Sequence, residues 1–152
     1  MKIGIIGSGH VGLVTGAGFA DLGNEVVCMD DDSQKIDLLK SNKIPFYEPG
    51  LFELVKRNRL EGRLHYTTAM REVIKRTQVI FLCVGTPPRA DGEADLSAIE
   101  HVAREIGRNL REYRLIVEKS TVPVRTGDQL YVMIKENLIR KRRLTLRPMQ
   151  NF

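Results

Sequence analysis

The sequence predicts an α/β fold built on a doubly wound parallel sheet. Short runs of β-branched and other apolar residues alternate along the chain with longer stretches of helical periodicity, a pattern typical of strand–helix–strand units. A glycine-rich turn follows the first apolar run, and an acidic residue ends the second. The length of 152 residues allows one domain with a substantial core and is short for two.

The predicted strands are short runs rich in valine and isoleucine, bounded by polar residues, glycine or proline. They span 2–6, 25–30, 63–68, 78–85 and 114–120. The fourth run is apolar at nearly every position, as expected for a central strand of a parallel sheet. Thr86, Pro87 and Pro88 end it, because proline cannot donate a hydrogen bond to a neighbouring strand.

The predicted helices carry apolar residues at helical spacing. They span 10–22, 33–41, 51–59, 69–76, 96–110 and 124–141. Gly23 and Asn24 stop the first helix, and Asp32 or Ser33 can cap the start of the second. Pro123 precedes the last one. No internal repeat or linker interrupts the series, so the elements form one domain.

Composition narrows the class of protein. Cys28 and Cys83 lie in apolar runs and are expected to be buried free thiols, with no CxxC pattern for zinc and no disulfide framework. No apolar run is long enough to span a bilayer, and the N-terminus does not resemble a signal peptide. We therefore expect a cytoplasmic protein without a membrane partner or a metal site.

The positive charge lies at one end of the chain. Five of the 24 Lys and Arg residues follow Ile139, and no acid accompanies them. The first 139 residues therefore carry 19 cations and 19 acids, although the whole chain has a net charge of +5. The domain itself is neutral, and its tail is basic.

The glycine-rich turn matches the G-x-G-x-x-G pattern of dinucleotide-binding folds. It comprises Gly7, Ser8, Gly9, His10, Val11 and Gly12. Gly7 permits a tight turn, Gly9 lets the backbone approach a pyrophosphate, and Gly12 lets the helix pack closely on the strand. The N-terminus of that helix offers unpaired amides and partial positive charge to phosphates. The sequence thus predicts a Rossmann-like domain, with a ligand-free structural turn as the alternative.

Asp30 stands at the end of the second strand, eighteen residues after Gly12. An acid at this place is expected to accept a hydrogen bond from the adenosine ribose. A 2′-phosphate would meet Asp30, with Asp31 and Asp32 close by, so the predicted cofactor is NAD rather than NADP.

Four further stretches go beyond a general dinucleotide fold. They are GLVTGAGFADLGNEVVCMD (12–30), IPFYEPGL (44–51), VGTPPRADGEADLS (84–97) and EKSTVPVRTG (118–127). In this order and spacing the chain resembles the N-terminal NAD-binding domain of the UDP-glucose/GDP-mannose dehydrogenase family, and most of all its UDP-glucose 6-dehydrogenases. The resemblance covers residues 1–139.

The resemblance implies an enzyme that oxidises the C6 alcohol of a nucleotide sugar to a carboxylate. It would do so in two hydride transfers to NAD, through a thiohemiacetal on a cysteine of a later domain. The same resemblance implies that Lys35 lies near the adenosine ribose, and that Ser120 and Thr121 lie by the nicotinamide ribose. The Thr121 hydroxyl would help to place the catalytic water.

The resemblance also implies that the segment after the fourth strand follows the cofactor. This segment consists of Val84, Gly85, Thr86 and Pro87. Independently, Thr86 and Thr121 end predicted parallel strands, where open α/β sheets bind ligands. The alternative that they merely terminate strands stays open. His10 replaces a tyrosine common in the family and is expected to lie beside the cofactor without acid–base work, while His65 and His101 are expected on a strand and on a helix surface.

Several family features are missing from this sequence. After the last helix the family continues with a sixth strand and then with the lysine, asparagine, cysteine and aspartate of its active site. The predicted fold is therefore truncated near the sixth strand, and this chain alone is expected to be inactive. A nucleotide sugar would bind only if the missing domain were supplied. The oligomeric state stays open, and UDP-glucose is favoured as the sugar by resemblance alone.

Residues 140–152 form a basic tail outside the resemblance, with three interpretations. A nucleic-acid-binding arm is least favoured because it has one aromatic residue, Phe152, for stacking. LTLR could form a substitute edge strand. The third is a change of reading frame between about residues 137 and 143. Gln150-Asn151-Phe152 can be encoded by bases that give Glu-Phe in another frame, and the resemblance implies Glu-Phe near this point. The alternatives for the whole chain are a free-standing NAD-binding regulatory module, or a dehydrogenase of GDP-mannose or UDP-N-acetylmannosamine.

Overall fold

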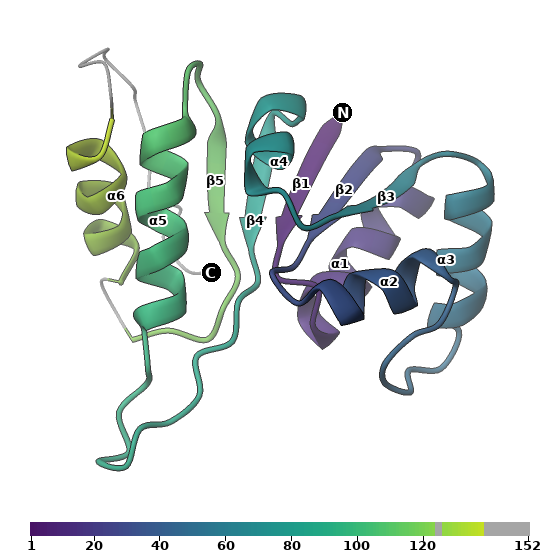
Figure 1. Ribbon diagram of the computed structural model, residues 1–152, viewed down its shortest axis with the longest axis horizontal. Coiled ribbons are helices and arrows are strands. Elements are labelled where there is room, and N and C mark those ends of the chain that lie inside the picture. The colour runs from purple at the N-terminus through teal and green to yellow at the C-terminus, as the bar shows by residue number, and fades with distance from the viewer. Residues whose placement is uncertain (124–125, 139–152) are drawn as a thin grey trace.

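A computed structural model describes residues 1–123 and 126–138 of the chain. Its centre is a sheet of five parallel strands (Figure 1): β1 (Lys2–Ile6), β2 (Glu25–Met29), β3 (Leu64–Thr67), β4 (Val79–Leu82) and β5 (Leu115–Glu118). The strands lie in the order β3-β2-β1-β4-β5. The chain thus builds outward from β1 in one direction and then returns to build outward in the other. This order confirms the predicted doubly wound parallel sheet.

In the described part of the chain, six helices accompany the strands. They are α1 (His10–Asp21), α2 (Ser33–Lys40), α3 (Leu51–Leu60), α4 (Met70–Arg76), α5 (Ser97–Asn109) and α6 (Thr126–Glu136). The Asp32 side chain caps α2 by accepting a hydrogen bond from the Lys35 amide at 3.1 Å. Gly23, with φ +85°, follows the end of α1 as expected for a helix stop.

The last helix is shorter than the sequence predicts. The expected range was 124–141, but α6 ends at Glu136, and residues 137 and 138 are not helical. The Met133 carbonyl accepts both the main-chain amide of Asn137, at 3.2 Å, and its side-chain amide, at 2.9 Å, so Asn137 closes the end of the helix. Positions 124–125 and 139–141 lie outside the described residues, as do the predictions for the tail.

Strands β3, β4 and β5 are also shorter than predicted. The ladder between β4 and β5 closes where the Lys119 amide donates to the Leu82 carbonyl at 2.9 Å. The next amide, that of Ser120, donates instead to the Glu118 side chain at 2.6 Å. Beyond β4 the apolar residues Cys83 and Val84 continue the run after the β4–β5 ladder has ended, which is why the predicted end of this strand extended too far.

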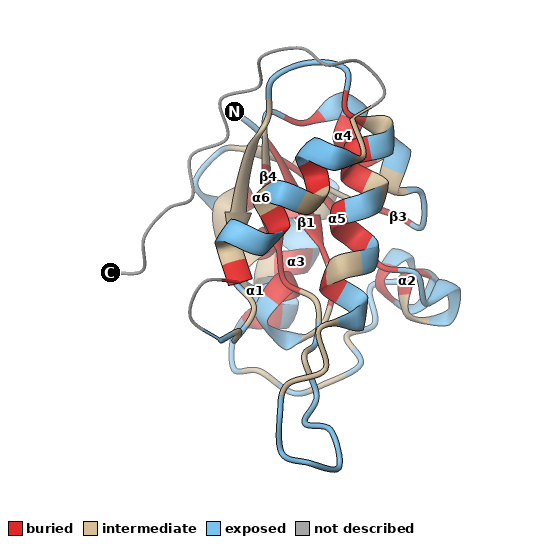
Figure 2. Cartoon of the chain, turned by 90° about the vertical axis from the view of Figure 1, so that its left-hand side faces the viewer, coloured by how far each residue is buried: buried red, intermediate tan, exposed pale blue. Residues whose placement is uncertain are grey.

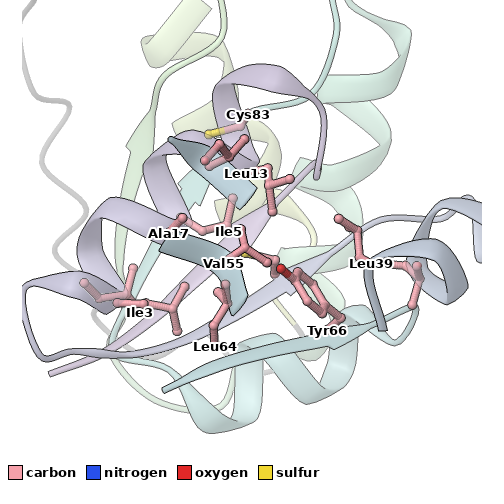
Figure 3. Packing of buried hydrophobic residues seen from close by; sticks show 14 residues of the cluster. Ile3, Ile5, Leu13, Ala17, Leu39, Val55, Leu64, Tyr66 and Cys83 are labelled. Carbon is pink, nitrogen blue, oxygen red and sulfur yellow. The ribbon is translucent and has the colours of Figure 1, made fainter. Parts of the chain in front are cut away.

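The core has two parts, one on each face of the sheet. Helices α1, α2 and α3 cover one face, and Ile5, Leu13 and Cys83 lie in that cluster (Figure 3). Helices α4, α5 and α6 supply the other cluster, which includes Ile6 and Leu82 from the strands. The buried residues of α5 and α6 face inward and their exposed residues face outward (Figure 2). Among the described residues, no helix combines the length and apolar character needed to cross a membrane.

Candidate functional site: a dinucleotide cradle at the carboxyl edge of the sheet

The turn after β1 contains three glycines, and the space around each of them differs. Gly7 has φ +96°, and a Cβ there would lie 2.6 Å from the Cys83 carbonyl oxygen. A Cβ on Gly12 would lie 1.8 Å from the Gly7 carbonyl oxygen, so α1 could not start so close to the strand. A Cβ on Gly9 would have nothing within 4 Å. The fold therefore requires Gly7 and Gly12, whereas Gly9 borders open space.

The amides of this turn point to an anion site. The Gly7 amide donates to the Met29 carbonyl at 2.8 Å, and the Ser8 amide donates to the Asp30 carboxylate at 2.8 Å. Among the described residues, no acceptor is found for the next four amides, those of residues 9–12. The first turn of α1 contains no acidic residue, so the helix has no carboxylate of its own to offset its dipole there. Free amides and a positive helix end together suit a phosphate group.

Asp30 is buried at the end of β2, with 6% of its surface exposed. Its carboxylate accepts hydrogen bonds from the Ser8 amide, from the Asp32 amide at 3.2 Å and from the Lys35 Nζ at 2.9 Å. Burial acts to raise the pKa of Asp30, but the bonds from Lys35 and the two amides outweigh it and hold the pKa below its ordinary value. Asp30 is therefore a fixed carboxylate beside the glycine turn, and Lys35 lies against it.

The segments after β4 and β5 meet at the same edge of the sheet. The Thr86 hydroxyl donates to the Thr121 carbonyl at 2.7 Å, and the Ser120 hydroxyl donates to the Leu82 carbonyl at 3.4 Å. Val84 packs against the second core cluster, and a Cβ on Gly85 would meet nothing within 4 Å. The Cys83 carbonyl lies next to Gly7, so the segment after β4 is also adjacent to the turn after β1.

All fourteen predicted site residues thus lie along one edge of the sheet. The structure links Asp30 to Ser8 and Lys35, and Thr86 to Thr121. This edge includes the place between β1 and β4 where the strand order reverses, which is the usual ligand crevice of an open α/β sheet. The contribution of each residue to cofactor binding stays a prediction.

Glu118 is a notable residue that the sequence prediction missed. It ends β5 beside Leu82, so it shares the face covered by the second core cluster. Its Oε1 accepts the Ser120 amide, but no partner is found for its buried Oε2 among the described residues. Burial raises the pKa of Glu118. An acid inside an apolar strand was the available signal.

The sequence prediction also missed the contribution of the loop between α2 and α3. Glu48 lies in this loop, and its Oε2 is 2.8 Å from the His10 Nε2. The Phe46 ring stacks on the His10 ring with centroids 4.8 Å apart and an angle of 11° between the planes. His10 is therefore tied to the loop as well as to the turn. His65 lies on β3 and His101 on the exposed side of α5, as predicted.

Neither cysteine suits nucleophilic chemistry. Both thiols are buried and unpaired by disulfides. Burial raises the pKa of the Cys28 thiol, and it raises the pKa of the Cys83 thiol to about 11. A thiol with a raised pKa carries little thiolate at neutral pH.

A cleft of about 910 Å³ lies elsewhere, between α4 and the C-terminal end of α5. Its lining includes Arg111 and Arg114, whose guanidinium groups donate to the Arg108 and Ile74 carbonyls at 3.1 and 3.0 Å. These cations satisfy carbonyls in and beside the last turns of two helices. We therefore place the functional site at the glycine turn and not in this cleft.

Comparisons with known proteins show the family to which the chain belongs. Residues 1–148 match the model of the UDP-glucose/GDP-mannose dehydrogenase family, NAD binding domain, so the match continues into the basic tail. The chain is 50% identical over 137 residues to UDP-glucose 6-dehydrogenase of Rhizobium meliloti, covering 90% of this chain and 31% of the relative. It is 43% identical over 126 residues to GDP-mannose 6-dehydrogenase of Pseudomonas aeruginosa, covering 83% and 28%.

A solved structure gives the same picture. The crystal structure of a ternary complex of GDP-mannose dehydrogenase from Pseudomonas aeruginosa superposes with a TM-score of 0.89 at 39% identity, covering 93% of this chain and 33% of that one. The chain thus spans about a third of the length of these relatives. The predicted cofactor agrees with the family's description. The chain belongs to the UDP-glucose/GDP-mannose dehydrogenase family and corresponds to its NAD-binding domain.

Proposed function

We propose that this chain binds NAD at the carboxyl edge of its sheet, with the pyrophosphate on the amides at the start of α1. The observation that carries the proposal is the open space in front of Gly9, next to four amides without an acceptor among the described residues. A pyrophosphate would supply acceptors for these donors, and its charge would be stabilised by the helix dipole.

The adenosine ribose would then lie by Asp30 and Lys35. Asp30 is held as a carboxylate by its three donors, so a ribose hydroxyl can donate to it. A 2′-phosphate would instead meet a negative charge, which Lys35 offsets only in part because it is already paired with Asp30. This arrangement favours NAD over NADP.

The nicotinamide half would follow the segments after β4 and β5. Val84, Gly85, Thr86 and Pro87 border the crevice from one strand, and Ser120 and Thr121 border it from the next. The bond from Thr86 to the Thr121 carbonyl ties the two segments together. The Thr121 hydroxyl makes no hydrogen bond to any described residue, which suits the supporting role in water placement that the family resemblance implies.

At the level of the whole protein, we propose the cofactor domain of an NAD-dependent nucleotide-sugar 6-dehydrogenase. UDP-glucose is the favoured substrate, and GDP-mannose and UDP-N-acetylmannosamine are the alternatives. The chemistry supplied by NAD is hydride acceptance; the described residues bind and orient the cofactor. Both cysteines of this chain are buried, so we assign the nucleophile and the sugar pocket to the rest of the family's length, which this chain does not span. A cytoplasmic location and the absence of a nucleic-acid partner are part of the same proposal.

Titration calorimetry with NADH and NADPH tests the cofactor. We expect saturable binding of NADH, weaker binding of NADPH, and no turnover of UDP-glucose by the chain alone. Circular dichroism and a cooperative thermal transition establish that the protein is folded. Absence of NADH binding by folded protein would refute the proposal, and tighter binding of NADPH would refute the role of Asp30.

Sequencing of the gene beyond codon 152 tests the whole-protein proposal. We expect one of the other two reading frames to encode a substrate domain with a reactive cysteine. Restoring that frame and assaying NADH formation with UDP-glucose and GDP-mannose then identifies the sugar. If no frame encodes such a domain, a free-standing NAD-binding module becomes the better description.

A further inference from the structure

His10 connects the cofactor turn to the loop between α2 and α3. It is the first residue of α1, and its Nε2 lies 2.8 Å from the Glu48 Oε2. Stacking on Phe46 fixes the plane of the ring. The His10 side chain nevertheless keeps 58% of its surface exposed, and that of Glu48 keeps 36%. One edge of the imidazole is therefore engaged while the ring remains open to solvent or to a ligand.

Glu48 places a carboxylate beside the end of α1 that would receive a pyrophosphate. Two anions brought close to one another repel, and the repulsion grows as the binding ligand displaces water. A neutral imidazole can donate from Nε2 to Glu48, but its Nδ1 then has no proton. An imidazolium donates from both nitrogens and adds a positive charge between the two anions. Histidine is the side chain suited to such a change near neutral pH.

We propose that the His10 side chain is a further ligand of the dinucleotide and takes up one proton when the pyrophosphate binds. The proton comes from solvent and is added at Nδ1, while Nε2–H continues to donate to Glu48. The imidazolium then lies between the carboxylate and the phosphates. This inference rests on the proposed NAD site, and it assigns to the side chain a role beyond that of the His10 amide.

The other charged groups around the turn leave this role to His10. The loop contributes Glu48, which is the partner in direct contact. Helix α1 has no acid in its first turn. At the end of β2, Asp30 and Lys35 are paired with each other at 2.9 Å. Among side chains, histidine has the ordinary pKa that lies nearest to neutral, so a histidine is the natural source of proton uptake near neutral pH.

Calorimetry in buffers of different ionisation enthalpy measures the proton directly. NADH is titrated at about pH 7 in two such buffers, and the difference in heat gives the number of protons taken up. We expect uptake of a fraction of a proton, up to one, and a Kd that rises with pH by at most about tenfold per pH unit. His10→Gln keeps a donor for Glu48 but cannot titrate, so it should bind NADH without uptake.

Two further variants sharpen the test. Glu48→Gln removes the carboxylate and should reduce the uptake, because the imidazolium loses one of its two anionic neighbours. His101→Gln, on the exposed side of α5, is the matched control and should leave both uptake and affinity unchanged. In wild-type protein, NMR of the histidine ring protons should show a His10 signal moving toward the protonated position when NADH is added, which needs no variant.

The outcomes separate this inference from the proposed function. NADH binding without proton uptake, or uptake that persists in folded His10→Gln, would overturn the role of His10 and leave the NAD site in place. Absence of NADH binding in folded wild-type protein would overturn both. Uptake that disappears in His10→Gln and persists in His101→Gln supports the inference.

Discussion

Gly9 is the position at which stability and cofactor binding can be separated. Its backbone angles, φ −72° and ψ −166°, are accessible to alanine, and a Cβ would meet no atom within 4 Å. We predict that Gly9→Ala folds normally and loses affinity for NAD. The new methyl group would stand where the pyrophosphate has to approach the amides.

The expected magnitudes follow from this geometry. Replacing glycine by alanine stabilises a compatible site by about 0.4–1 kcal/mol, through the unfolded chain. Alanine is a poorer N-cap residue than glycine, which costs a similar amount. The free energy of unfolding should therefore stay within about 1 kcal/mol of wild type. Loss of one hydrogen bond to a charged phosphate costs about 1.5–3 kcal/mol, which weakens NADH binding roughly ten- to a hundredfold.

Two other glycines of α1 provide the controls. Gly18 also borders open space, but it lies two turns further along the helix, so Gly18→Ala should bind NADH as wild type does. Gly12→Ala would place a Cβ 1.8 Å from the Gly7 carbonyl oxygen. Relief of that overlap should cost about 2 kcal/mol or more and lower the Tm by roughly 4–8 °C.

The assay combines thermal denaturation with NADH titration for all three variants. The reasoning predicts lost binding with a retained fold for Gly9→Ala, both retained for Gly18→Ala, and a weakened fold for Gly12→Ala. If Gly9→Ala bound NADH within about twofold of wild type, the pyrophosphate would not lie on these amides.

Three further predictions concern side chains of the same edge. Burial raises the pKa of Glu118, so the folded state favours its protonated form. Acidification from pH 7 should therefore stabilise wild type relative to Glu118→Gln, which urea unfolding at several pH values would measure. Asp30→Asn should reduce the preference for NADH over NADPH on the order of tenfold, measured as the ratio of the two Kd values. Thr86→Val removes the bond to the Thr121 carbonyl and should lower the free energy of unfolding by at most about 1 kcal/mol while weakening NADH binding several-fold, as urea unfolding and calorimetry would show.

The fold could be predicted from sequence because its determinants are local. Apolar runs separated by helical periodicity gave the strand and helix order, and Gly7 and Gly12 marked the turn by steric needs that no other residue meets. The ends of the strands were harder to predict from the sequence. Apolar residues continue past Leu82, but a ladder needs a partner strand, and the partner turns away after Glu118.

The site was predictable in part for the same reason. Gly9, Asp30 and their neighbours belong to a pattern that is short in sequence. The contact between His10 and Glu48 joins residues 38 positions apart through a loop whose path no local pattern describes. The burial of Glu118 likewise depends on its position beside Leu82, on the sheet face that α4, α5 and α6 cover. Such contacts require the tertiary arrangement.

The charge of the domain indicates how a neutral protein can hold a dinucleotide. Residues 1–139 carry equal numbers of cations and acids, and Lys35 at the site is already paired with Asp30. Attraction of the pyrophosphate therefore depends on main-chain amides and the dipole of α1, which are fixed by the fold and act at short range. A side chain that becomes charged when the ligand arrives adds to this attraction without placing a permanent cation on the surface. In this respect His10 complements the glycine turn.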